Sequence, residues 1–505
     1  MGCCASERVH ETSNHPKPPQ SPKPASSHFV MPSRKVSAGD EVAMLNTSVS
    51  DSLIGCTQVK LKAKSCVQHL AGPLSLHYNF IAKLESSRGR ALMLAEFLST
   101  RKRCVIEKIS KKQGKLTKAS TREQAFELSR RLDHPHIRKV YEVVQDNDFV
   151  YIIYETCEGG ELSELLRNKQ KLPTNQAAML MNQLFSVLHY CHNLGVVHGK
   201  LGLGSLALKN KPTHTAVNVR IAGFCKTEDN AWLPAPETIG GEPTPPADLW
   251  SCGVILYRLL TGQAPFKASS GLWEVTFPAG VQAYISADAI SLIRQLLSAN
   301  PRDRPSAAEC LVHPWVQRFS SPVSLSSKES RKHLANLRSG ITSASIREAV
   351  LRFILDRVVA QEQIDKVTKT FEALDVNGDG ILSKEELKAG LCIVMPETKA
   401  QAEVEKIMRR VATSGSDQID YSTFLLVSLG DDTLLSDANL MTAFRSFDLD
   451  GSEKISVEEL KKVFHVGKDK GEGAAWIALI KEIDTSGDGE IDFGEFCALM
   501  RRASN

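Results

Sequence analysis

Two twelve-residue segments near the end of this 505-residue chain repeat one arrangement of oxygen-bearing side chains. They read DVNGDGILSKEE from residue 375 and DTSGDGEIDFGE from residue 484. Each has oxygen donors at positions 1, 3, 5 and 9, a glycine at position 6 and a glutamate at position 12. That spacing wraps oxygens around one Ca²⁺ ion, and the glycine permits the sharp turn. The sequence therefore predicts two calcium-binding loops of the EF-hand type, which we number loop 1 and loop 4.

Two segments between them match the same template in part. Loop 3, DLDGSEKISVEE from residue 448, has Glu453 where the glycine belongs, so we expect a strained positive φ and a lower calcium affinity. Loop 2, ATSGSDQIDYST from residue 412, lacks a carboxylate at positions 1 and 12, where Ala412 and Thr423 stand, and should be structural. Four hands paired into two lobes resemble calmodulin. The predicted ligands, with position 7 acting through its carbonyl, are Asp375, Asn377, Asp379, Ile381, Ser383, Glu386, Asp448, Asp450, Ser452, Lys454, Ser456, Glu459, Asp484, Ser486, Asp488, Glu490, Asp492 and Glu495.

The charge is unevenly distributed along the chain. Residues 365–505 contain 17 Lys+Arg against 27 Asp+Glu, net −10, which leaves +14 for residues 1–364. The basic excess is not a stripe interleaved with aromatic residues, so we expect no nucleic-acid partner. Attraction between an acidic and a basic part of one chain is the simpler explanation. No window approaches the ~20 consecutive apolar residues of a membrane span, and we expect the chain to stay on the cytosolic side.

The N-terminus carries a lipidation pattern. The chain begins MGCCAS, which fits N-myristoylation of Gly2 after removal of Met1. One myristoyl chain holds a protein to membrane only marginally, and palmitoylation of Cys3 and Cys4 would supply the second anchor. The alternative is a chance match with idle thiols. Residues 1–74 therefore read as a disordered, acylated tail that tethers the protein to the cytoplasmic face of a membrane, with the plasma membrane favoured.

A series of motifs occupies the basic part of the chain. In order they are VVHGKLGLGSLAL (196–208), VRIAGFCKT (219–227), APE (235–237), DLWSCGVILYRLLTGQAPF (248–266) and NPRDRPSAAECLVHPWV (300–316). Their order and spacing resemble the protein kinase fold, and with the EF-hands the chain resembles a calcium-dependent protein kinase. The resemblance implies an α+β bilobal kinase-like domain at 75–318, a junction at 319–364 and an all-α module of four EF-hands at 365–503. We call the first the kinase-like domain and the last the EF module.

The resemblance also implies a set of scaffold contacts. Glu237 of the APE motif would pair with Arg304, and Asp248 would hold the backbone near His198. Glu161 stands where kinases contact the ribose of ATP. These residues support the fold and say little about phosphoryl transfer.

The residues that perform the chemistry are replaced. In the kinase pattern H-R-D-x-x-x-x-N the aspartate accepts a proton and the asparagine holds Mg²⁺. Lys200 and Ser205 occupy those two positions, and Gly223 replaces the aspartate of D-F-G, which binds the principal Mg²⁺. An ammonium group cannot act as a base at neutral pH, and loss of the base alone costs ~10²–10⁴ in rate.

The nucleotide-binding elements are degenerate as well. Glu85, Ser87 and Arg90 stand in place of the three glycines that cover the phosphates. The ATP-binding lysine aligns with Glu107, or with Lys108 if the strand is shifted by one residue, and periodicity does not decide between them. Lys108 and Glu161 are the candidate nucleotide contacts, and Mg²⁺–ATP binding is doubtful.

These losses favour a pseudokinase over a slow or unconventional kinase, for which Asp229 is the sole candidate substitute for a lost carboxylate. The junction contains a basic amphipathic helix with Val350, Phe353 and Ile354 at 3/4 spacing and arginines on other faces. It suits the groove of a calcium-loaded EF lobe. The alternative is a plain connector packed on the kinase lobe. We expect a membrane-tethered calcium sensor whose kinase-like domain binds a partner protein or kinase. The competing class is an active, calcium-regulated serine/threonine kinase, and a third is a passive calcium buffer.

Overall fold

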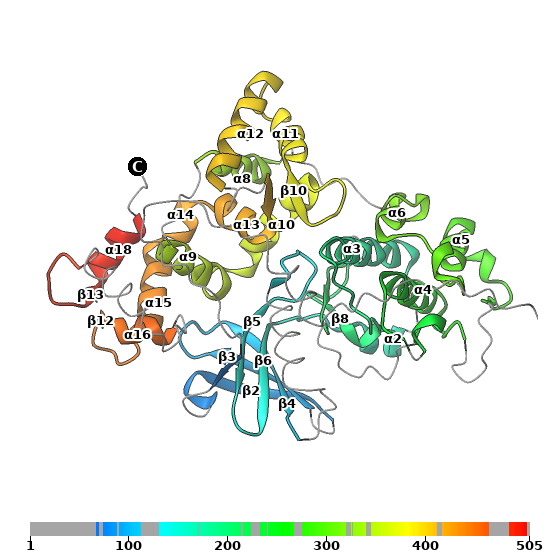
Figure 1. The fold of residues 1–505 in the computed structure, drawn as a ribbon, viewed down its shortest axis with the longest axis horizontal. Helices are drawn as coiled ribbons and strands as arrows, with labels where there is room; N and C mark the ends of the chain where they lie inside the picture. The colour runs from blue at the N-terminus through cyan, green and yellow to red at the C-terminus, as the bar shows by residue number, and fades with distance from the viewer. Residues whose placement is uncertain are drawn as a thin grey trace, which may run out of the picture. The chain divides into compact units, whose positions relative to one another are not determined.

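The computed structural model describes residues 67–69, 74–87, 90–112, 131–169, 171–213, 216–223, 233–239, 241–266, 275–319, 325, 327–339, 345–411, 417–463 and 484–501. All of these residues belong to one compact unit, residues 58–505 (Figure 1). Gly2, Cys3 and Cys4, the predicted acylation sites, lie outside the described residues. Within the described ranges, no helix has both the length and the apolar character that a bilayer span requires.

A six-stranded, mostly antiparallel sheet forms the first lobe, in the order β1-β5-β6-β4-β3-β2. Because alternate side chains of a strand point to opposite faces of the sheet, the strand at residues 103–110 contributes side chains to two apolar clusters. Ile109 packs with Ile152 on one face, whereas Cys104 and Ile106 pack with Ile153 on the other. The strands are β1 (Val67–His69), β2 (Tyr78–Ser87), β3 (Arg90–Phe97), β4 (Arg103–Ser110), β5 (Val140–Gln145) and β6 (Phe149–Glu155).

The second lobe is helical, with a small three-stranded sheet at its edge (Figure 1). Its strands are β7 (Gly160–Glu161), β8 (Leu206–Leu208) and β9 (Val219–Ile221). Its helices are α2 (Leu162–Lys169), α3 (Thr174–Asn193), α4 (Pro245–Thr261), α5 (Ala287–Leu296), α6 (Ala307–Leu311) and α7 (Pro314–Gln317). Short 3₁₀ turns are η1 (Leu74–Leu76), η2 (Leu203–Ser205), η3 (Pro236–Thr238), η4 (Val281–Ala283) and η5 (Pro301–Asp303).

Helix α4 illustrates how local sequence sets these boundaries. It begins at Pro245, where a missing N–H costs nothing, and ends at Gly262, whose φ of 78° closes the C-terminus. Between them Trp250 is fully buried and stacks on Phe266 with ring centroids 5.3 Å apart. Helix α3 is buried along most of its length, so these two helices form the centre of the lobe.

The EF module consists of two pairs of hands, each joined by a short antiparallel ladder. Strand β10 (Ile381–Ser383) of loop 1 pairs with β11 (Gln418–Asp420) of loop 2, and β12 (Lys454–Ile455) of loop 3 pairs with β13 (Ile491–Asp492) of loop 4. The described helices are α10 (Gln361–Leu374), α11 (Lys384–Cys392), α12 (Glu397–Val411), α13 (Tyr421–Leu429), α14 (Asp431–Leu434), α15 (Asp437–Phe447), α16 (Val457–Val463) and α18 (Phe493–Arg501). The expected fold class, a bilobal kinase-like domain followed by a helical EF-hand module, is confirmed.

The junction forms two helices, α8 (Lys328–Ser339) and α9 (Ser345–Arg357). The apolar residues of α9 join the core of the EF module, where the Phe353 ring lies 4.8 Å from that of Phe447. Arg347 is one of the arginines that the sequence places on other faces of this helix than the apolar residues, and the structure buries it. Its guanidinium donates to the Met500 carbonyl at 3.0 Å and to Asp431 at 3.2 Å. Helix α9 therefore packs on the EF module along most of its length.

Candidate functional site

Loop 1 is folded around its predicted ligands. The Asp375 carboxylate accepts hydrogen bonds from the Asp379 and Gly380 backbone amides at 3.1 and 2.9 Å. Glu386 accepts from the amide of Asn377 at 3.3 Å and from that of Ser383 at 3.0 Å. Ser383 also caps helix α11. The side chains at positions 1, 3, 5, 9 and 12 thus all accept hydrogen bonds from backbone amides of the loop, and the amide of Ile381 donates to Asp379.

The first ligand of loop 1 lies in an unusual environment. Burial, together with the nearby carboxylates of Asp379 and Glu386, raises the pKa of Asp375 to about 7, although the hydrogen bond from the Gly380 amide acts in the opposite direction. In loop 4 the corresponding pKa, that of Asp484, is lowered, chiefly by the backbone hydrogen bond from Gly489. The two complete loops therefore differ in how readily a proton competes with calcium.

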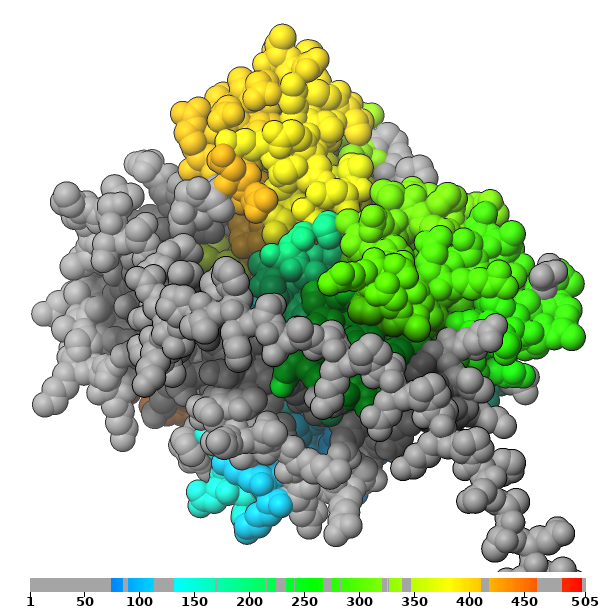
Figure 2. All heavy atoms as spheres, turned by 45° about the vertical axis from the view of Figure 1, so that its right-hand side comes forward, coloured from blue at the N-terminus to red at the C-terminus, as the bar shows by residue number. Residues whose placement is uncertain are grey.

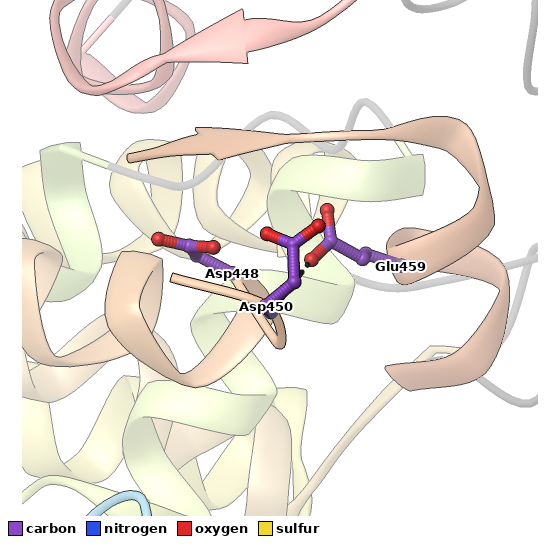
Figure 3. Close-up of side chains that lie close together, drawn as sticks. All are labelled: Asp448, Asp450 and Glu459. Atoms are coloured by element: carbon purple, nitrogen blue, oxygen red, sulfur yellow. Dashed lines mark hydrogen bonds between the residues drawn. The ribbon is translucent and has the colours of Figure 1, made fainter. Parts of the chain in front are cut away.

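Loop 3 brings three acidic side chains together (Figure 3). Carboxylate oxygens of Asp448, Asp450 and Glu459 all lie within 4.8 Å of one another. The expected backbone strain is confirmed, since Glu453 has a φ of 64°. Ser452 and Lys454 line the same turn, with the Ser452 hydroxyl donating to the Lys454 carbonyl at 3.2 Å. Ser456 donates to Glu459 at 2.7 Å and caps the following helix. The lower affinity stays a prediction.

Loop 4 repeats the arrangement of loop 1. Glu495 accepts from the amides of Ser486 and Asp492 at 2.9 and 3.0 Å, and Asp492 accepts in turn from the Glu495 amide. The amide of Glu490 donates to Asp488 at 3.0 Å. A feature not expected from sequence is an ion pair between Asp488 and Lys454 of the neighbouring loop.

Loop 2 serves as a partner for loop 1. Its Ile419 is buried opposite Leu382 in the β10–β11 ladder, and Asp420 caps helix α13 by accepting from the Thr423 amide at 2.7 Å. Ala412 lies outside the described residues. The oxygen donors of loops 1, 3 and 4 fit Ca²⁺, which prefers carboxylate and carbonyl ligands. Bound there, calcium would neutralise the clustered carboxylates of each loop.

The scaffold contacts of the kinase-like domain are present. Asp248 accepts from the amides of His198 and Gly199, each at 2.9 Å. Arg304 makes two parallel hydrogen bonds to Glu237, at 2.6 and 2.8 Å. A bidentate guanidinium–carboxylate pair of this kind fixes orientation as well as distance. The backbone that carries the catalytic loop of a kinase is therefore held in place.

The catalytic positions on this backbone lack catalytic groups. Gly223 has a φ of 92°, and a Cβ built there would stand 3.4 Å from the Ser205 hydroxyl. Ser205 donates to the Lys200 carbonyl at 3.5 Å, so Lys200, Ser205 and Gly223 do lie together. Gly199 replaces an arginine and has a φ of 76°, and a Cβ there would lie 2.8 Å from Pro243. Residues 224–232, with Asp229, lie outside the described residues.

The strand register places Glu107 and Lys108 on opposite faces of the sheet. Glu107 is 4% exposed, and its carboxylate accepts from Nε of Arg90 at 2.6 Å. Arg90 follows the β2–β3 turn, which covers the phosphates in a kinase, so Glu107 points to the place of the ATP-binding lysine. The Lys108 ammonium lies over the Phe149 ring, 3.7 Å from its centroid. Lys108 therefore faces away from the nucleotide cleft.

The other nucleotide candidate, Glu161, accepts a hydrogen bond from the Ser163 hydroxyl at 3.0 Å and is partly exposed. Taken together, the cleft does not fit Mg²⁺–ATP. The metal-binding carboxylate is replaced by Gly223, and a glycine side chain offers no ligand to Mg²⁺. The carboxylate of Glu107, paired with Arg90, stands where a kinase has the lysine that meets the phosphates, so that lysine's charge is missing from this position.

Sequence reasoning missed the residues that join the two domains. The buried ammonium of Lys209 pairs with Asp365 of helix α10, and Asp133 accepts from both the amide and the hydroxyl of Ser422, at 2.8 and 2.7 Å. The Arg357 guanidinium lies 3.9 Å from the centroid of the Phe97 ring. Nothing in the local sequence around Lys209, Asp133 or Arg357 indicates its partner.

Comparisons with known proteins agree with this geometry. Residues 93–316 match the family model described as protein kinase domain, residues 367–391 the EF hand and residues 437–501 the EF-hand domain pair. The chain is 30% identical to calcium-dependent protein kinase 4 of Plasmodium falciparum (isolate 3D7) over 433 residues, 79% of this chain and 81% of the relative. It is 28% identical to calcium-dependent protein kinase 4 of Plasmodium berghei (strain Anka) over 91% of this chain and 93% of the relative. It is 30% identical to calcium-dependent protein kinase 3 of Oryza sativa subsp. japonica over 72% of this chain and 69% of the relative.

A kinase-type fold followed by paired calcium-binding loops defines a calcium-regulated, kinase-like protein. The chain belongs to the calcium-dependent protein kinase family.

Proposed function

We propose that this protein is a calcium-switched regulator whose kinase-like domain does not transfer phosphate and instead binds a partner protein or kinase. The observation that carries the proposal is the pair of missing carboxylates, because Lys200 and Gly223 replace the groups that take the proton and hold the metal. The pairing of buried Glu107 with Arg90 supports it, because a neutralised ion pair stands where a kinase has the lysine that binds the phosphates.

The contacts between the two domains supply a route for the calcium signal. Helix α10, which leads into loop 1, carries Asp365 to Lys209 of the kinase-like domain, and the junction helix ends at Arg357 beside the sheet. A conformational change in the EF module on calcium binding would alter this interface. The partner protein would then contact one surface of this protein when calcium is bound and a different surface when it is not.

Two measurements test the proposal on the full chain. Thermal unfolding should shift upward with saturating Ca²⁺ and stay unchanged with Mg²⁺–ATP, since stabilisation grows as RT ln(1 + [L]/Kd). Incubation with radioactive ATP and a peptide acceptor should give no calcium-stimulated labelling. Turnover at an ordinary kinase rate, ~1–100 s⁻¹, would contradict the proposal. If calcium binds without changing the small-angle scattering profile, the protein acts as a passive calcium buffer and not as a switch.

The competing function is an active, calcium-regulated serine/threonine kinase. The intact pairing of Glu237 with Arg304 and the position of Asp248 favour it, because both support a catalytic loop. This function predicts calcium-stimulated labelling that disappears when Glu107, the residue at the position of the ATP-binding lysine, is replaced. Labelling that is unaffected by this change would point to a contaminating kinase.

We also propose that acylation at Gly2, Cys3 and Cys4 tethers the protein to the cytoplasmic face of a membrane. The change Gly2→Ala should move the protein from the membrane fraction to the soluble fraction, and a Cys3→Ser, Cys4→Ser double variant should do so in part. Equal partition of all three proteins would contradict the tether.

A further inference from the structure

Loop 1 lies directly against the kinase-like domain, and Figure 2 shows this part of the EF module, in yellow, beside the green helical lobe. At Gly378, position 4 of the loop, a Cβ would stand 3.2 Å from Cδ1 of Leu311 in helix α6. At Gly380, position 6, a Cβ would overlap the His134 ring. Among the described residues, nothing lies within 4 Å of a Cβ built at Gly451 of loop 3 or at Gly487 or Gly489 of loop 4, and at Gly494 of loop 4 the neighbour is Oδ1 of Asp492 in the same loop, at 3.2 Å.

A directed chain of hydrogen bonds crosses this contact. The His136 amide donates to Nδ1 of His134 at 3.1 Å, so the neutral ring carries its proton on Nε2. Nε2 lies 3.0 Å from Oγ of Ser186 and donates to it. The Ser186 hydroxyl is then left to donate its own proton, and it does so to the Gly378 carbonyl at 2.8 Å.

The position of Gly378 makes this hydrogen bond relevant to calcium. Its peptide lies between Asn377 and Asp379, the ligands at positions 3 and 5. Fixing the carbonyl of position 4 restrains the backbone from which both ligands project. Ile381, whose carbonyl is the ligand at position 7, also packs against the core of the kinase-like domain.

We propose that Ser186 of the kinase-like domain is a positioning residue of calcium loop 1, so that the kinase-like domain helps to set the calcium affinity of that loop. The inference rests on the proposed function, since it names the site through which the switch acts. The contact between the two domains favours calcium binding in loop 1 by a certain free energy. By linkage, calcium bound in loop 1 stabilises that contact by the same free energy.

The test isolates loop 1 in the full-length protein. In a background with Glu459→Gln and Glu495→Gln, loop 1 is the one loop that keeps its position 12 glutamate. Calcium titration calorimetry should give a dissociation constant that rises roughly two- to ten-fold with Ser186→Ala, the range expected for one neutral hydrogen bond. Ser186→Thr keeps the hydroxyl and should restore most of the affinity.

Two controls separate positioning from general damage. Ser251→Ala removes a comparable buried hydroxyl, which donates to the Ala247 carbonyl at 3.2 Å far along the sequence from loop 1, and should leave the constant unchanged. In a Glu386→Gln background, where loops 3 and 4 bind, Ser186→Ala should have no effect. An unchanged constant in the loop 1 background, or an equal loss in both backgrounds, would overturn this inference alone. Absence of calcium binding to an intact loop 1 would overturn the proposed function as well.

Discussion

At the scale of single residues, two glycines of the kinase-like cleft have backbone angles that favour glycine. Gly223 and Gly199 both have positive φ, at 92° and 76°, and each stands where the kinase pattern has a residue with a side chain. Because L-residues rarely adopt such angles, a side chain put back at either position would be strained on this backbone. We therefore expect that restoring one lost side chain does not restore the site.

The change Gly223→Asp tests this point. The new carboxylate would have to adopt the strained backbone of Gly223 or move the chain, so we expect no gain in Mg²⁺–ATP binding. The measurement is the thermal shift with and without Mg²⁺–ATP, with the calcium-induced shift as the control for folding. A clear nucleotide-induced rise in this single variant would mean that the metal carboxylate alone was limiting.

The pKa values of the first ligands predict a difference between loops 1 and 4. Calcium binds the ionised carboxylate, and burial raises the pKa of Asp375 to about 7, whereas the pKa of Asp484 is lowered. As the pH falls from 8 to 6, protons should compete at loop 1 and weaken its calcium binding by up to roughly ten-fold, while loop 4 should change little. Titrations report loop 1 in the Glu459→Gln, Glu495→Gln double variant and loop 4 in the Glu386→Gln, Glu459→Gln double variant. Equal pH dependence would contradict the prediction.

At the scale of elements, short ladders couple the loops in pairs. The β12–β13 ladder sets Lys454 of loop 3 beside loop 4, where its ammonium pairs with Asp488. The cation at position 7 of one loop thus meets a predicted ligand of the next, and calcium in loop 4 has to compete with it. In loop 3, only the carbonyl of Lys454 is a predicted ligand. The side chain of Lys454 nevertheless affects calcium binding in loop 4.

The change Lys454→Met should raise the calcium affinity of loop 4 by roughly two- to five-fold and reduce its salt dependence, since an exposed ion pair is weak and screened. The control is Lys384→Met, because Lys384 pairs with Asp417, which is not a predicted ligand. Calcium titration at low and high salt measures both effects. A fall in affinity with Lys454→Met would show that the lysine helps to organise the loop instead.

At the scale of the whole molecule, buried charges hold the EF module against the kinase-like domain. The Lys209 side chain is 3% exposed and pairs with Asp365, and Arg220 beside it pairs with Glu155 at 3.1 Å. Burying charges in this way is costly unless each has a partner. The interface is therefore sensitive to the loss of one partner.

The change Lys209→Met removes the cationic partner of Asp365, which keeps its hydrogen bond from Gln361, and should weaken the contact by roughly 1.5–3 kcal/mol. We expect faster hydrogen exchange in helix α10 together with unchanged exchange in α4, which lies in the core of the other domain. Lys112→Met, which removes an exposed pair with Asp148, is the matched control and should change neither helix. Uniform acceleration across the chain would indicate global destabilisation instead.

The sequence by itself determined the features that depend on residue type at a fixed spacing. The oxygen ligands of the calcium loops and the strained φ at Glu453 follow from position within twelve residues. The replacements Lys200 and Gly223 are equally local. The calcium ligands and these replacements can therefore be predicted without knowing which distant segments they contact.

The tertiary structure alone decided the rest, because those features depend on which distant segments meet. The register between β3, β4 and β6 places Glu107 toward Arg90 and Lys108 over Phe149, which one strand's periodicity leaves open. The contact of Ser186 with Gly378 joins residues 192 positions apart. Nothing near either residue in the sequence specifies the other, since the packing of two domains brings them together.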